Sequence, residues 1–241
     1  MPRFYCDLPL AVGRRIELPA ETARHAVGAL RLRSGETVTL FNGDGAQYSG
    51  TLELQGKGAA VQLIEHAAPQ RESNLHITLA QGISSGERMD LTLQKSVELG
   101  VAAIQPLFMR RSVVKLSGDK AERRRQHWQG VAISACEQCG RNLIPLVAEI
   151  QEFIPWLQNH TDSTQRYLLD PEAETSLREL PVPTSRILLL AGPEGGFDPA
   201  ERKAAVAAGY QRVRLGPRIL RTETAALAAI AAMQAVWGDF R

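Results

Sequence analysis

Residues 186–199 read Arg-Ile-Leu-Leu-Leu-Ala-Gly-Pro-Glu-Gly-Gly-Phe-Asp-Pro, and this stretch indicates the fold. The apolar run over 186–191 predicts a strand that is covered on both faces, as in a parallel sheet. The glycine-rich residues 192–197 predict a loop. Asp198 and Pro199 then predict the N-cap and first position of a helix, and Glu201 completes a capping box. A buried strand, a loop and a helix in direct succession are typical of an α/β domain.

The same alternation extends over residues 74–241. Further strands are predicted at 75–80, 101–107, 166–170 and 211–215, and further helices at 88–99, 119–139 and 224–237. We therefore expect a mostly parallel sheet with helices on both faces.

The first 70 residues follow a different pattern. Asn42-Gly43 and Asp44-Gly45 are hairpin signals between short runs of alternating apolar and polar residues, which predict a small β-barrel. A polar stretch over 67–74 separates the two patterns. The expected domains are therefore 1–70 and 74–241.

Composition and charge narrow the class of protein. The chain has 241 residues, of which 44% are hydrophobic and 22% charged, so it has enough apolar residues for a folded core. The net charge is only +2, but residues 106–128 contain seven bases against two acids, and the first 33 residues contain six arginines against three acids. Solvated helix faces would explain either basic segment alone. Two separate segments favour a polyanionic partner.

The cysteines and the apolar segments exclude other classes. Cys6, Cys136 and Cys139 are too few for a disulfide scaffold. Cys136 and Cys139 form a lone C-x-x-C within a predicted helix, which favours buried thiols over a metal or redox site. No apolar stretch approaches the roughly 18 residues that span a bilayer, and residues 1–7 lack a signal-peptide pattern. We expect a cytoplasmic protein that contacts no membrane and holds no metal.

Two loops follow strand ends, which is where open α/β sheets bind ligands. They are residues 192–197 and residues 216–225. Neither contains the P-loop pattern or the G-x-G-x-x-G pattern of a dinucleotide site. Such a pair of loops suits a cofactor with an adenine, a ribose and a small zwitterion. Two plain turns without a ligand are the alternative interpretation.

These loops also carry a resemblance, through Gly192-Pro193-Glu194-Gly195-Gly196-Phe197 and then Leu215-Gly216-x-Arg218-Ile219-Leu220-Arg221-x-Glu223-Thr224-Ala225. Further matches are residues 94–101, Arg111-Ser112, residues 137–141, and Arg3-Phe4-Tyr5. Together they closely resemble the bacterial small-subunit ribosomal RNA methyltransferase E family, uridine-N3 methyltransferases of the SPOUT superfamily. The resemblance implies a PUA-like barrel before an α/β domain with a trefoil knot. It also implies a homodimer, the cofactor S-adenosylmethionine, and as substrate one uridine in the decoding region of 16S rRNA within the assembled small subunit.

The resemblance assigns site residues as expectations. Cofactor binding is expected at Leu169, Gly192, Pro193, Glu194, Gly195, Gly196, Leu215, Gly216, Ile219, Leu220, Arg221 and Thr222, with Asp170 beside Leu169. RNA binding is expected at Arg3, His25, Arg31, Arg33, Arg110, Arg111, Arg123 and Arg124. Arg221 is the first candidate to stabilise a uracil anion, and Arg141 is the second. Glu223 is expected either to accept the N3 proton or to orient Arg221.

Two other functions remain open at this level. One is a non-catalytic RNA-binding or ribosome-assembly protein of the same fold, against which the intact pair of loops argues. The other is a SPOUT methyltransferase that acts on tRNA or on a ribose 2′-OH. The barrel that precedes the α/β domain argues for ribosomal RNA instead.

Overall fold

The structure is a computed structural model that describes residues 1–56, 58–114, 117–159 and 165–240. It divides into two compact units. The first unit holds Met1–Glu72 together with Cys136–Ile144, and the second holds the rest of the described chain. A boundary drawn along the sequence cannot include Cys136–Ile144 in the first unit, because this segment joins it through tertiary contacts alone.

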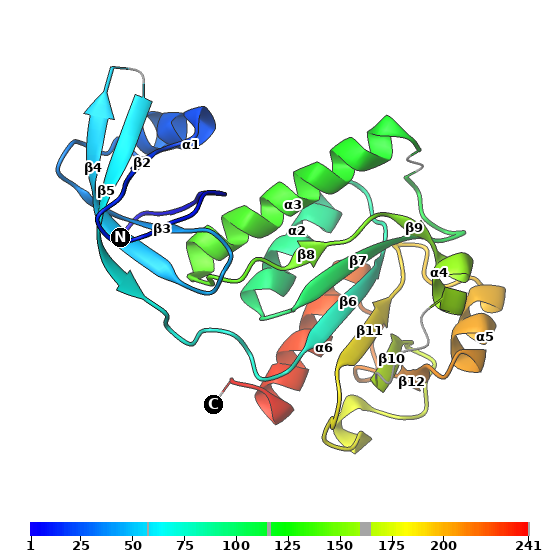
Figure 1. Cartoon of the computed structure of the whole chain (residues 1–241). Helices are drawn as coiled ribbons and strands as arrows, with labels where there is room; N and C mark the ends of the chain where they lie inside the picture. The colour runs from blue at the N-terminus through cyan, green and yellow to red at the C-terminus, as the bar shows by residue number, and fades with distance from the viewer. Residues whose placement is uncertain (57, 115–116, 160–164, 241) are drawn as a thin grey trace. The chain divides into compact units, whose positions relative to one another are not determined.

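The first unit is built on a mixed sheet in the order β1-β3-β4-β5-β2 (Figure 1). Its strands are β1 (Arg3–Tyr5), β2 (Arg15–Glu17), β3 (Thr37–Phe41), β4 (Gln47–Gln55) and β5 (Gly58–Ala67). The predicted hairpin at Asn42–Gly45 is confirmed, because β3 and β4 pair in antiparallel fashion on either side of it. A short helix, α1 (Ala20–Arg24), continues into one π-helical turn, η1 (His25–Ala29). Phe4, Leu40 and Val61 are among the fully buried side chains that close this core.

The segment Cys136–Ile144 is held in the first unit by polar contacts at the end of a helix. The carbonyl of Gly140 accepts hydrogen bonds from Arg3 Nη2 at 3.2 Å and from Arg71 Nη1 at 2.8 Å. Cations at this position complement the negative end of the helix dipole. The backbone N–H of Tyr5 donates to Glu137 Oε1 at 2.9 Å. These contacts tie the end of the helix to β1.

The second unit contains a parallel sheet in the order β12-β10-β11-β6-β7-β8, with β9 also paired to β7. The strands are β6 (Ile77–Gly82), β7 (Ala103–Phe108), β8 (Leu146–Val147), β9 (Gln151–Glu152), β10 (Gln165–Leu169), β11 (Ile187–Ala191) and β12 (Gln211–Val213). Every described pairing in this sheet is parallel, which confirms the sequence prediction. All five residues of β11 are buried, as expected for a strand covered on both faces.

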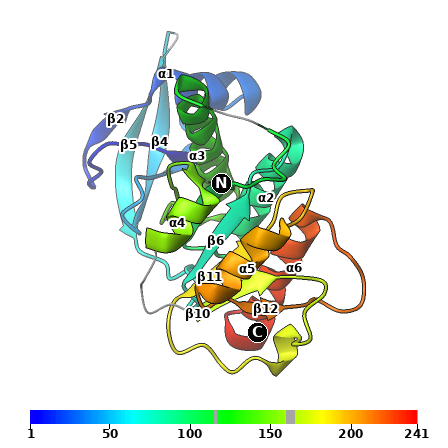
Figure 2. The same cartoon turned by 90° about the vertical axis from the view of Figure 1, so that its right-hand side faces the viewer.

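Helices cover both faces of this sheet, which confirms the predicted α/β arrangement (Figure 2). They are α2 (Gly86–Glu98), α3 (Asp119–Cys139), α4 (Phe153–Asn159), α5 (Pro199–Ala207) and α6 (Thr222–Trp237), with a 3₁₀ turn η2 (Leu177–Glu179). Leu188 and Leu190 of β11 pack into one cluster with residues of α4 and α5. α6 contacts β11 and packs along α2. The predicted capping box of α5 is confirmed, because Asp198 Oδ1 accepts from Ala200 N at 2.9 Å. The trefoil knot stays a prediction.

The three cysteines are free, and burial raises the pKa of Cys136 to about 12, so its thiol is not ionised near neutral pH. Over the described residues, no three His, Cys, Asp or Glu side chains gather as a metal site would need. Among the helices described, none combines the length and apolar character of a membrane span.

Candidate functional site

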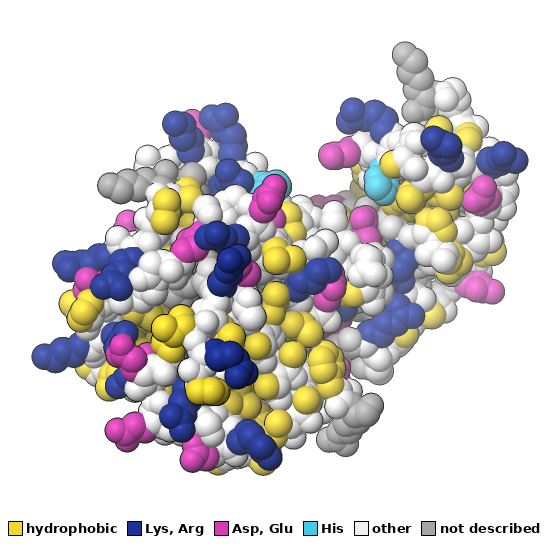
Figure 3. All heavy atoms as spheres, turned by 180° about the vertical axis from the view of Figure 1, so that it is seen from behind, with side chains coloured by type: hydrophobic (Ala, Val, Ile, Leu, Met, Phe, Trp, Pro, Cys, Tyr) yellow, Lys and Arg dark blue, Asp and Glu magenta, His cyan; other side chains and the backbone are white. Residues whose placement is uncertain are grey.

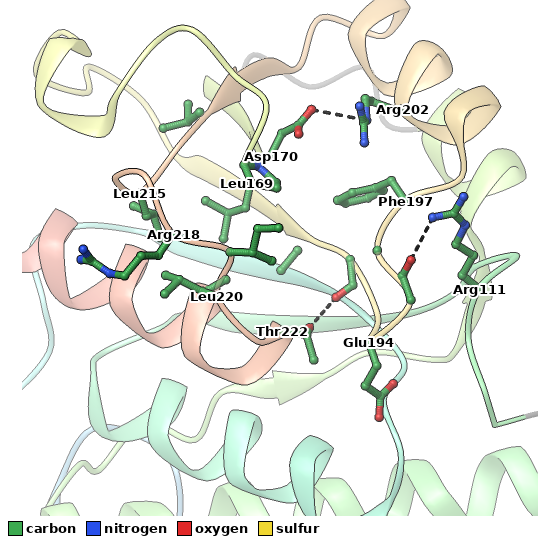
Figure 4. A pocket seen from close by; sticks show the side chains of 18 residues that line it. Arg111, Leu169, Asp170, Glu194, Phe197, Arg202, Leu215, Arg218, Leu220 and Thr222 are labelled. Carbon is green, nitrogen blue, oxygen red and sulfur yellow. Dashed lines mark hydrogen bonds and ion pairs between the residues drawn. The ribbon is translucent and has the colours of Figure 1, made fainter.

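A cavity of about 270 Å³ lies in the second unit, at the carboxyl ends of β10, β11 and β12 (Figure 4). The parallel register brings these ends together, so that Leu169, Ala191 and Val213 all line the cavity. Two loops, 192–197 after β11 and 214–221 after β12, complete its walls. The predicted site at strand ends therefore exists as a cavity, but the two strands are not adjacent, because β10 lies between β11 and β12.

Most of the cavity wall is apolar. Leu169, Leu215 and Leu220 lie on one side of it and Phe197 on the other (Figure 4). The first loop is joined to the start of α6, directly after the second loop, where Thr222 Oγ1 donates to Gly192 O at 2.5 Å. An apolar cavity with backbone polar groups at its edge is the usual form of a small-molecule site, although the volume here lies just below the common range of roughly 300–1,000 Å³.

Arg111 packs directly on the first loop. A Cβ atom on Gly195 would lie 2.9 Å from Arg111 Cβ, so only glycine allows this approach. The guanidinium Nη1 donates to Gly195 O at 3.0 Å (Figure 4). Arg110 N donates to Glu201 Oε1 at 2.8 Å, which anchors the same segment to α5. The residues after β7 therefore hold the rim of the cavity in place.

Glu194 points away from the cavity, although its backbone lines it (Figure 4). Its Oε1 accepts from Ser85 N at 2.8 Å and from Ser85 Oγ at 2.7 Å. Desolvation raises the pKa of this carboxyl, but the hydrogen bonds from Ser85 and the charge of Arg88 outweigh it, so the pKa lies below its ordinary value. The side chain thus anchors the loop to the start of α2 and leaves the cavity to the backbone.

One carboxylate, Asp170, is buried at the end of β10 and belongs to the cavity wall. Its Oδ2 accepts from Arg212 Nε at 2.6 Å and lies 3.4 Å from Arg202 Nε. Removal of either arginine would leave a buried charge without full compensation. This group links β10, β12 and α5 around the cavity.

The predicted cofactor residues divide into two sets. Those that line the cavity are Leu169, Gly192, Glu194, Gly195, Gly196, Leu215, Ile219, Leu220 and Thr222. Pro193, Gly216 and Arg221 are not among the described lining residues but adjoin members of the lining. The two loops, far apart in sequence, therefore meet at one site.

The three predicted catalytic residues belong to different units. Arg221 is exposed at the N-cap of α6, outside the described lining. In the part of the chain that is described, no ion pair joins Arg221 to Glu223, and Glu223 Oε2 is buried without a hydrogen-bond partner. Arg141 belongs to the first unit, where its Nη2 donates to Glu72 Oε2 at 2.6 Å. The catalytic roles stay predictions.

The predicted RNA-binding residues are spread over both units. Arg3 is occupied structurally, since it donates to Gln47, Asn142 and two backbone carbonyls. Arg31 and Arg33 are exposed, and Arg31 has a φ of 54°, which a non-glycine residue seldom adopts. Arg123 and Arg124 border a shallow hollow on α3 with Lys120 and His127. The remaining members are His25, which packs edge-on against Phe4, Arg110, which is exposed, and Arg111, which lines the cavity.

Sequence reasoning missed several cavity residues. Ala191 ends a predicted strand and Val213 lies within another, so both could have been predicted from the sequence. Arg202 carried no local signal for the cofactor site, whereas Arg218 lies in the second motif but was not assigned to the cofactor. Arg202 of α5 enters the wall beside Asp170, the residue after β10, with which it forms an ion pair. Arg218 lines the rim while its guanidinium points away from the cavity (Figure 4).

Two family models match the chain. The model described as an RNA methyltransferase domain matches residues 71–234, and the RNA methyltransferase PUA domain matches residues 18–64. A ribosomal RNA small subunit methyltransferase E from Buchnera aphidicola is 34% identical over 99% of this chain and 98% of its own.

Solved structures agree. A ribosomal RNA small subunit methyltransferase E from Neisseria gonorrhoeae, bound to S-adenosyl methionine, has a TM-score of 0.93 at 44% identity over 100% of both chains. A Legionella pneumophila protein in complex with the cofactor SAM has a TM-score of 0.94 at 38% identity over 99% of this chain and 98% of its own. Since relatives more than 30% identical are matched over nearly their full length, the chain belongs to the ribosomal RNA small subunit methyltransferase E family.

Proposed function

We propose that the protein transfers a methyl group from S-adenosylmethionine to N3 of one uridine in the decoding region of 16S rRNA, in the assembled small subunit in the cytoplasm. The observation that carries the proposal is the cavity at the ends of β10, β11 and β12, lined by both motif loops. Family membership supplies the RNA substrate. The resemblance supplies the uridine and its N3 atom.

The cavity fits a cofactor that has a flat base and no phosphate. Leu169, Leu215 and Leu220 offer apolar surface for an adenine ring. Two arginines of the wall are engaged by protein groups. Arg202 forms ion pairs with Asp170 and Glu172, and Arg111 donates a hydrogen bond to Gly195 O. The side chain of Arg218 points away (Figure 4). A guanidinium aimed inward would favour a phosphate.

S-adenosylmethionine would supply an activated methyl group on its sulfonium. The protein then has to align uracil N3 with that methyl group and lower the cost of removing the N3 proton. The resulting anion spreads onto O2 and O4 of the base, so a fixed guanidinium beside it is stabilising. Because pairing blocks N3, the uridine has to be unpaired or flipped out.

Arg221 is our candidate for this guanidinium. It is exposed and sits between Leu220, which lines the cavity, and Thr222, which holds the first loop. Glu223 follows on α6 and is the candidate proton acceptor. Arg141 is the weaker candidate for the anion, because it already pairs with Glu72.

RNA docking is proposed to use both units. We assign RNA binding to the domain 1–70 through His25, Arg31 and Arg33, and methyl transfer to the domain 74–241. A strained backbone such as that of Arg31 is often kept for function. The exposed basic face of α3 would contact phosphates, which position an enzyme without reading a base.

A homodimer is also proposed, with α6 at the interface. From Thr224 to Gly238 the chain has no charged residue. The outer side of α6 is nevertheless accessible at Ala225, Ala228, Ala231, Ala232, Ala235 and Val236. Apolar side chains gather over the larger unit on the face that Figure 3 shows. Ile219, which lines the cavity, is 86% exposed, so a second copy there would also close the cofactor site.

The deciding experiment is transfer of labelled methyl groups from S-adenosylmethionine to undermethylated small subunits, to naked rRNA and to tRNA, followed by nucleoside mapping. We expect label at N3 of uridine, on small subunits only. Label in tRNA or on a ribose would contradict the proposal and favour another SPOUT activity. A calorimetric titration that gives no heat with S-adenosylmethionine would instead indicate a non-catalytic RNA-binding protein.

A further inference from the structure

Gln81 is the last residue but one of β6, and its side chain is fully buried. It lies next to the cavity but is not among the described lining residues. Its Nε2 lies 3.2 Å from Gly192 O, 3.0 Å from Thr222 Oγ1 and 3.0 Å from Gly82 O. Carbonyl oxygens only accept hydrogen bonds, so the atom that faces them is the amide nitrogen. Thr222 in turn donates to Gly192 O. The three groups form a closed triangle of hydrogen bonds.

This triangle joins the two loops of the cavity. Gly192 begins the loop after β11, and Thr222 is the first residue of α6, directly after the loop that follows β12. We infer that Gln81 is a positioning residue that fixes the first loop against the start of α6 and thereby sets the affinity of the cavity for S-adenosylmethionine. The inference rests on the proposed function for the identity of the ligand.

The residues after Gln81 strengthen the same connection. A Cβ atom on Gly82 would lie 2.5 Å from Pro193 N, so the backbone of β6 is in direct contact with the first loop. Ser85 holds Glu194 of that loop through two hydrogen bonds. Of these contacts, the one made by Gln81 also reaches α6. Without it, the first loop would stay attached to β6, and its described hydrogen bond to the start of α6 would be the single one from Thr222 Oγ1 to Gly192 O.

Loss of the Gln81 contact should lower the affinity of the cavity for S-adenosylmethionine. Both loops contribute to the lining, so a ligand contacts them together. If their relative position is not fixed beforehand, binding has to order them, which weakens affinity. RNA binding, proposed to use the basic residues, does not depend on this triangle.

The test is Gln81→Met, which keeps the length of the side chain and removes its donors. We expect the Kd for S-adenosylmethionine by calorimetry to rise about tenfold, the size of one or two missing hydrogen bonds. The KM for S-adenosylmethionine should rise equally, while the KM for small subunits stays the same. A merely structural role would not separate the two KM values.

Gln105→Met is the matched control. Gln105 is also buried, on the neighbouring strand β7, and its Nε2 donates to Pro106 O and Glu149 O. It should lose similar thermal stability but keep the cofactor Kd of the wild type. If Gln81→Met loses stability and keeps the wild-type Kd as well, the inference is wrong.

Thr222→Val gives a second measurement that does not require Gln81→Met to fold. It removes the hydroxyl of the triangle and should also weaken cofactor binding. Because both changes break one triangle, the double variant should lose less than the sum of the two single effects. An unchanged Kd for Thr222→Val, or fully additive effects, would overturn the inference. Absence of cofactor binding by the wild type would instead refute the proposed function.

Discussion

At the residue scale, Glu194 shows how a motif residue can serve the site without facing it. Its side chain leaves the cavity and fixes the loop through Ser85 (Figure 4). The resemblance predicts cofactor binding at this position. The geometry gives that task to the backbone of Glu194 and gives the carboxylate an anchoring task.

Glu194→Gln should therefore change how stability depends on pH. The pKa of Glu194 is lowered on folding, so its stabilising contribution is complete above the ordinary carboxyl pKa and is lost as pH falls through the lowered value. We expect the wild type to lose this contribution below about pH 4, whereas the variant lacks it at every pH. Urea unfolding measured across a pH series tests this. Glu87→Gln, an exposed change on α2, is the control. An equal fall in the free energy of unfolding at acid pH in all three proteins would contradict this role.

Arg221→Ala tests the proposed catalytic guanidinium. Removal of one group that stabilises developing charge costs a factor of about 10²–10³ in kcat. We expect a loss of this size in methyl transfer to small subunits, measured at saturating cofactor, with S-adenosylmethionine still bound in calorimetry. Near-normal turnover would exclude Arg221 and make Arg141 the next residue to test.

At the element scale, the two ends of α3 have different roles. Its last residues are fixed in the first unit through Glu137 and the Gly140 carbonyl. Its earlier half exposes Lys120, Arg123 and His127 around a shallow hollow. This half carries the basic cluster that the charge pattern indicates.

The variant with Arg123→Ala and Arg124→Ala should bind small subunits more weakly and with less dependence on salt. For every phosphate that the variant no longer neutralises, the slope of log affinity against log salt should fall by about 0.7–0.9. Filter binding over a salt series measures this slope. The neighbouring Arg125→Ala is a matched control, because Arg125 pairs with Glu122 at 2.6 Å. Slopes that do not differ from the wild type would remove α3 from the RNA-binding surface.

At the scale of the whole molecule, the outer face of α6 is apolar, yet contacts within a single chain leave it accessible. An apolar helix face that stays accessible is typical of an interface. Here it adjoins Ile219 at the cofactor cavity. Association of two copies would therefore complete the site as well as bury the helix.

Val236→Glu should make the protein monomeric in light scattering, because it places a charge on that face. Cofactor affinity should fall with the dimer. Val182→Glu changes another exposed valine of the second unit and should leave the oligomeric state unchanged. A wild type that is itself a monomer, or a dimer that survives Val236→Glu, would rule out this interface.

Much of the fold could be predicted from local sequence patterns. The buried run of β11, the capping box at Asp198 and the hairpin at Asn42 each depend on neighbours within a few residues, so periodicity and turn chemistry could predict them. The motif loops were predictable for the same reason. The membership of Cys136–Ile144 in the first unit was not, because its contacts with Tyr5 and Arg71 join residues far apart in the chain.

The sequence by itself determined the α/β class, the parallel sheet, the two loops at strand ends and the family. Tertiary structure alone decided which side chains face the cavity. Arg202 enters its wall, Glu194 turns away, Arg3 becomes a structural anchor, and Gln81 joins the loops. The physical reason is that local preferences act within a few residues, whereas a buried polar group takes whichever partners the packing of distant elements brings within hydrogen-bond distance.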